Sequence, residues 1–207
     1  RTAPLMNPPK LLPSGMTSSF SNYFRLGYEH IVSFDALDHI LFIIALMAVF
    51  QLRHWVKMVL AITYFAVGHS LSLALAATGV VEFNTDLIEF LIPLTIVFTA
   101  LLNLTQGGRD VQGRSKYWLA GIFGLIHGMG FSTYFGMLVM GDSGIWKALL
   151  PFNLGVEVGQ LVVVGALLLL LVIYEFFLNK KIRDWTLFWS GVAFGLAATM
   201  CIETWPF

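Results

Sequence analysis

Five ionisable side chains interrupt the long apolar stretches of this 207-residue chain: Asp38, His39, His69, His127 and Glu157. An ionisable group in hydrocarbon is costly unless it is paired or wetted, so each of the five is a candidate functional residue. Neutral imidazole and carboxylate groups together suit divalent zinc, nickel, cobalt, manganese or iron. The residue types therefore predict a divalent transition-metal site, with nickel, cobalt and zinc as the principal candidates.

Further polar residues are expected around this site. Asn153, Glu157 and Gln160 recur at i, i+4 and i+7, which places them on one face of a helix. His30, on an amphipathic segment that precedes the other ligands, is expected to close the site from outside. The predicted metal ligands are His30, Asp38, His39, His69, His127 and Glu157, and the predicted surrounding residues are Asn153, Gln160, Ser70 and Glu89. No residue is assigned a catalytic role.

The alternative is that these polar groups only hydrogen-bond one another or backbone carbonyls. Membrane helices use such bonds to stabilise their contacts. A single buried histidine is compatible with that interpretation. Several histidines at one depth in the membrane favour a shared ligand.

The composition requires a membrane environment for the elements that carry these residues. The chain is 57% hydrophobic and only 12% charged, whereas soluble proteins average about 25% charged residues. Its net charge is zero and its basic residues form no long run, which excludes nucleic acid as a partner. The chain has one cysteine, so neither a disulfide framework nor a thiolate zinc site is available.

The hydropathy pattern predicts an all-α, polytopic membrane helical bundle of about six transmembrane helices. Each crossing of a hydrocarbon core of about 30 Å takes roughly 20 helical residues. The predicted spans are 36–52, 56–80, 86–106, 116–140, 146–177 and 185–204. Residues 20–32 alternate apolar and polar residues at helical spacing and are predicted as an interfacial helix. Residues 1–19 are expected to be disordered or processed, and residues 20–207 to form one domain.

Basic residues in the short loops predict the orientation, because lysine and arginine near helix ends are retained in the cytoplasm. The basic residues fall in the first, third and fifth connections: Arg53 and Lys57; Arg109, Arg114 and Lys116; Lys180, Lys181 and Arg183. Both termini are then periplasmic, and His54 lies in a cytoplasmic loop, outside the site. With this orientation the five intramembrane residues fall between the outer mouth and the bilayer centre, which predicts one outward-facing site.

Four blocks of the sequence resemble the HupE/UreJ family of bacterial membrane proteins. They are His30-Ile31 with DHILF at 38–42, GHSLSL at 68–73, GLIHGMGF at 124–131 and FNLGVEVGQ at 152–160. The resemblance implies a multi-pass protein of the bacterial inner membrane, similar to permeases that supply nickel to hydrogenase and urease. His30 lies further from Asp38 than in the compact motif of the nickel members, which indicates a sister branch of the family.

Three functions are compatible with these features. The first is a nickel- or cobalt-type metal permease. The second is an intramembrane zinc hydrolase acting on lipid or peptide, although the chain has no H-E-x-x-H motif. The third is a structural subunit, because the small size and short loops permit assembly into an oligomer or a larger membrane complex. The permease is favoured, with the lipid bilayer and a metal ion as the expected partners.

Overall fold

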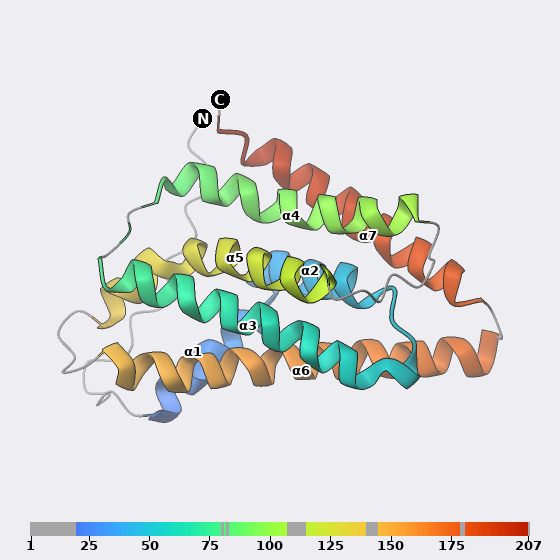
Figure 1. Cartoon of the computed structure of the whole chain (residues 1–207), viewed down its shortest axis with the longest axis horizontal. Coiled ribbons are helices and arrows are strands. Elements are labelled where there is room, and N and C mark those ends of the chain that lie inside the picture. Colours follow the sequence, from blue (N-terminus) through green and yellow to red (C-terminus); the bar gives the residue numbers. More distant parts are fainter. Residues whose placement is uncertain are drawn as a thin grey trace.

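The computed structural model describes residues 20–79, 81, 83–106, 115–139, 145–178 and 181–206, and these residues form seven α-helices (Figure 1). The helices are α1 (Phe20–Val32), α2 (Leu37–Met47), α3 (Trp55–Ala77), α4 (Thr85–Thr105), α5 (Ser115–Val139), α6 (Ile145–Leu178) and α7 (Ile182–Glu203). Short 3₁₀ turns at Phe34–Ala36 and Leu52–His54 precede α2 and α3. The segment 1–19, and the loop residues Arg109, Arg114 and Lys180, lie outside the described residues.

The prediction of a polytopic helical membrane bundle is confirmed, but with four to five candidate spans instead of six. Helices α3, α4, α6 and α7 are each long and apolar enough to cross a membrane, and α1 with α2 forms a pair, bent by 66°, that qualifies as one further span. Helix α5 has 25 residues, but five of them are glycines, and others are serine, histidine, lysine and tyrosine. These residues interrupt its apolar sequence, although 25 helical residues are enough to cross the hydrocarbon core.

Helix α2 is shorter than the predicted span 36–52. Its 11 residues cover about 16 Å, roughly half of the hydrocarbon core. Carbonyl groups at a helix end need partners when they are buried away from water. Two side chains from distant parts of the chain supply them: Asn103 Nδ2 donates to the Ala45 carbonyl at 2.8 Å and Thr186 Oγ1 donates to the Ala48 carbonyl at 2.8 Å. These bonds allow α2 to end inside the bundle.

Glycines bring the helices that carry the site into close contact. On α3 and α5, a Cβ on Gly68 would meet the Gly121 carbonyl, and a Cβ on Gly124 would meet the Phe65 carbonyl. Helix α1 packs along α6 in the same way, because a Cβ on Gly155 would meet the Phe24 carbonyl. Small residues permit such backbone approach between membrane helices. Helices α4 and α7 lie together on the opposite side of the bundle (Figure 1).

Candidate metal centre

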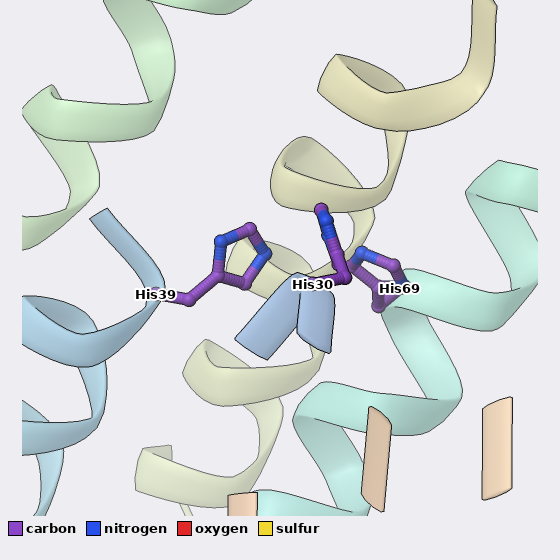
Figure 2. Close-up of side chains that lie close together, drawn as sticks. All are labelled: His30, His39 and His69. Atoms are coloured by element: carbon purple, nitrogen blue, oxygen red, sulfur yellow. The ribbon is translucent and has the colours of Figure 1, made fainter. Parts of the chain in front are cut away.

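Three histidines from three helices converge inside the bundle. His30 comes from α1, His39 from α2 and His69 from α3, and their rings face a common space (Figure 2). The ring centroids are 4.7 Å apart for His30 and His39, 5.7 Å for His30 and His69, and 5.8 Å for His39 and His69. One ligand nitrogen from each ring lies within 4.8 Å of the other two. This is a spacing at which three imidazoles can hold one metal ion.

A second group of possible ligands overlaps the first through His39. It consists of Asp38, His39 and His127 of α5, whose ligand atoms also lie within 4.8 Å of one another. The rings of His39 and His127 are 5.1 Å apart. His39, His69 and His127 are at most 4% exposed. The cluster therefore contains four imidazoles from four helices, together with one carboxylate.

Asp38 orients the shared histidine. Its Oδ1 accepts from the His39 backbone N–H at 2.8 Å and lies 3.0 Å from His39 Nδ1. Because an ionised carboxylate only accepts hydrogen bonds, this contact assigns the ring proton to Nδ1. His39 Nε2 is then the nitrogen with a lone pair, and it has no hydrogen-bond partner among the described residues. A carboxylate that fixes the tautomer of a metal-ligating histidine in this way is common in metal sites.

Thr95 of α4 does the same for His127. The Thr95 hydroxyl donates to the Ile92 carbonyl at 2.7 Å and also lies 3.0 Å from His127 Nε2. With its one proton used, the hydroxyl accepts from Nε2–H, which leaves the lone pair on His127 Nδ1. That atom is buried without a partner in the described part of the chain, as are Nε2 of His30 and both ring nitrogens of His69. Each imidazole thus presents at least one nitrogen that a metal ion could occupy.

Aromatic rings enclose the cluster. Phe131 lies 4.1 Å from the His30 ring, and Phe152 stacks on Phe131 at 5.3 Å with an interplanar angle of 9°. Phe65 lies 5.2 Å from His127. An apolar shell of this kind limits the access of water and lowers the local dielectric constant, so interactions between an ion and its ligands are strengthened.

Glu157 lies outside both groups of possible ligands. Its Oε1 accepts a hydrogen bond from Thr63 of α3 at 3.2 Å. On the same helix face, Asn153 Oδ1 and both amide atoms of Gln160 are buried with no partner among the described residues. The polar face predicted for 153–160 is therefore partly buried in the bundle, and its role at a metal site stays a prediction.

The remaining two predicted surrounding residues, Ser70 and Glu89, make no hydrogen bond to the cluster among the described residues, and their role stays a prediction. Ser70 donates back to the Ala66 carbonyl at 2.7 Å within α3, and Glu89 is exposed on α4. Sequence reasoning missed Thr95. The pattern that could have indicated it is the series Thr95, Thr99 and Asn103 at i, i+4 and i+8, which places three polar residues on one face of a helix. The structure brings together His30, Asp38, His39, His69 and His127, and their role as ligands stays a prediction.

The fold and this centre define a class of protein: a polytopic helical membrane protein with a buried histidine cluster that could bind a metal ion. Residues 8–205 match the family model described as HupE / UreJ protein, so the chain belongs to the HupE/UreJ family. The resemblance carried by the four sequence blocks is thereby confirmed. This family is linked to nickel uptake. Searches of curated proteins and of solved structures returned no match.

Proposed function

We propose that the protein is a membrane permease for a divalent transition metal ion of the nickel or cobalt type, with His30, His39, His69 and His127 as its ligands. The observation that carries the proposal is the convergence of four imidazoles from four helices, each with a buried ring nitrogen that has no partner among the described residues. A buried polar atom without a partner costs about 1–3 kcal/mol, so a cluster that served only helix packing would pair these nitrogens. A bound ion would satisfy them.

The donor set suits a cargo that must be both selected and released. Neutral imidazole prefers transition metals over magnesium and calcium. Nitrogens bound at 2.0–2.1 Å in tetrahedral geometry stand about 3.3 Å apart, so groups whose atoms lie within 4.8 Å have room to close on an ion. Because the ligands sit on separate helices, small helix movements would open and close the site. A site that opens in this way can release its ion.

The overlap of the two groups supports movement of the ion within the cluster. Both groups share His39. Its Nδ1 is bonded to Asp38, which leaves the ring lone pair on Nε2. An ion held by His30, His39 and His69 could pass to the side of Asp38 and His127 while it remains bound to His39. We assign Asp38 to orientation of His39 and to charge compensation. Glu157, with its bond to Thr63, is assigned to the polar surroundings of the site.

The proposed setting is the bacterial inner membrane, with α5 as a further crossing that makes six, both termini periplasmic and the ion moving from the periplasm to the cytoplasm. The charges of Arg53, Lys57, Lys181 and Arg183 support this orientation. The partners are then the lipid bilayer and the metal ion. An oligomer or a membrane complex remains compatible with the short loops.

The test compares His69→Ala with His54→Ala in purified protein reconstituted in liposomes that contain a nickel-sensitive dye. His54 is the matched control because it is the one histidine of five outside the cluster, about 22 Å from His69 along the chain direction of α3. Wild type and His54→Ala should bind nickel reversibly, at about one ion per chain, and should admit it into the liposomes. His69→Ala should lose at least tenfold in both measurements.

Equal binding by the two variants would refute the site. If a bound ion is retained after treatment with a chelator and no nickel enters the liposomes, transport is refuted. That result would indicate a metallohydrolase or a structural ion. Repeating the titration with cobalt and zinc ranks the candidate ions.

A further inference from the structure

A polar face of α4 connects the histidine cluster to a cavity near the end of that helix. Thr95 contacts His127 Nε2 at 3.0 Å, and Thr99, Asn103 and Gln106 follow at intervals of four, four and three residues. This spacing keeps all four on one side of the helix. From Thr95 to Gln106 the rise is about 16 Å, roughly half of the hydrocarbon core. Thr95, Thr99 and Asn103 are at most 5% exposed, so this face points into the bundle.

The cavity at the far end of this face has a volume of about 240 Å³. At about 30 Å³ per molecule of liquid water, it has room for roughly eight waters, enough for an ion with a hydration shell. It is lined by Leu46, Phe98, Thr99, Leu102, Asn103, Gln106, Lys116 and Leu119. The polar lining residues from α4 are those of the same helix face.

The polar atoms that this face offers are oxygens. Thr99 Oγ1 donates its proton to the Thr95 carbonyl at 2.8 Å, which leaves its lone pairs. The Asn103 amide nitrogen donates to the Ala45 carbonyl at 2.8 Å and to Ser190 Oγ at 3.2 Å, so its oxygen remains as an acceptor. Neutral oxygens bind transition metals less strongly than imidazole does. An ion that moves from the cluster along α4 therefore passes from strong to weak ligands.

The end of α2 supplies a second feature at the same level, where Asn103 binds the Ala45 carbonyl. Helix α2 ends inside the bundle, and Leu46 in its last turn lines the cavity. The C-terminal end of a helix carries a partial negative charge that stabilises cations. Broken helices in transporters use such ends to coordinate cations within the membrane. The early end of α2 thus makes this part of the bundle favourable for a passing cation.

Lys116 marks the far side of the cavity. Its ammonium lies 5.8 Å from the centre of the Phe50 ring, and the side chain lines the cavity. A fixed positive charge at this end disfavours prolonged residence of a cation. The ion would be held strongly at the cluster and only weakly at the cavity, where the charge of Lys116 opposes the negative end of α2, and this difference favours departure into water.

We propose that the face of α4 formed by Thr95, Thr99, Asn103 and Gln106 is the route by which the ion leaves the histidine cluster, and that the cavity beside it is a hydrated exit vestibule. The inference rests on the proposed permease function. It adds a path from the cluster to the end of the bundle that the loop charges predict to be cytoplasmic.

Cysteine accessibility tests the route without relying on transport. Cys201 is the one cysteine of the chain, so Cys201→Ala provides a thiol-free background. In that background, Thr99→Cys and Asn103→Cys are compared with Leu101→Cys, which lies on the exposed face of α4. A charged, membrane-impermeant thiosulfonate is added to inside-out and right-side-out vesicles. Positions 99 and 103 should react at least tenfold faster than position 101 from the cytoplasmic side. Equal rates, or labelling only from the periplasmic side, would overturn the proposal.

A second measurement separates this inference from the proposed function. Thr99→Val is nearly isosteric, and the hydroxyl that it removes bonds the Thr95 carbonyl instead of an imidazole. Thr105→Val is its control, because Thr105 is exposed on α4 and bonds the Leu101 carbonyl in the same way. Thr99→Val should keep nickel binding within about threefold and slow nickel entry at least tenfold. If Thr99→Val transports like Thr105→Val, the route is wrong. If wild type binds no nickel, the permease function fails, while the labelling experiment still decides whether the path is hydrated.

Discussion

Substitution of Gly128 by alanine tests whether the close contact of α3 and α5 sets the geometry of the cluster. A Cβ at this position would meet the His69 carbonyl oxygen and the Ser72 hydroxyl. It would stand 2.9 Å from the His69 carbonyl carbon, about 0.5 Å inside the 3.4 Å at which ordinary contact begins. Because most of the obstruction is backbone, a side-chain rotation cannot relieve it. Helices α3 and α5 must therefore separate by at least this amount.

The separation moves His69 relative to His127, since these residues lie on the two helices in question. Overpacking of this kind typically costs about 1–3 kcal/mol of stability. Metal–ligand distances tolerate deviations of only about 0.2 Å, so a shift of 0.5 Å is expected to weaken nickel binding at least tenfold, or about 1.4 kcal/mol. Both effects should appear together, because they have one cause.

The control is Gly136→Ala on the same helix, where a Cβ would meet no atom within 4 Å. This change gains helix propensity, up to about 1 kcal/mol, without a clash. Thermal unfolding in detergent and nickel titration are measured for both variants. Gly128→Ala should unfold at a lower temperature and bind nickel more weakly, whereas Gly136→Ala should match or exceed wild type in both. If the two variants behave alike, the reasoning from helix contact is wrong.

Three further predictions concern single side chains. Asp38→Asn removes the charge that orients His39 and should weaken nickel binding by about 10–100-fold in a dye-competition titration; unchanged affinity would contradict the role given to the carboxylate. Glu157→Gln should keep nickel affinity within about threefold, or about 0.7 kcal/mol, and a tenfold loss measured in the same titration would return this residue to the ligand set. Gly155→Ala should displace α1 from α6 and weaken nickel binding through the histidine of α1, whereas Gly165→Ala, which meets no atom within 4 Å, should leave the nickel dissociation constant unchanged.

Much of the helical framework could be predicted from the sequence. The apolar stretches predicted as 86–106 and 146–177 differ from α4 and α6 by one residue at each end, and the amphipathic segment 20–32 coincides with α1. These limits are local properties, because the length of an apolar run and its flanking residues decide where a membrane helix begins and ends. The histidines were also local signals, since an ionisable residue within an apolar run is conspicuous wherever its partners lie.

The end of α2 could not be predicted from its own residues. The apolar run continues through Phe50, whereas the helix ends earlier, where the side chains of Asn103 and Thr186 bind the Ala45 and Ala48 carbonyls. Those partners are 58 and 138 residues away along the chain from the carbonyls that they bind. The same holds for the tautomer of His127, which depends on the hydroxyl of Thr95 in another helix.

The sequence by itself thus determined the membrane class, the helical framework and the residue types of the candidate centre. Tertiary structure decided which of those residues meet: His30, His39, His69 and His127 converge, whereas Glu157 bonds to Thr63 outside both groups. The physical reason is that depth in the membrane follows from position along each helix, whereas the direction of a side chain toward its partners follows from how the helices are rotated and packed. Close backbone contacts at glycines fix that packing, and they exist only between segments that are distant in sequence.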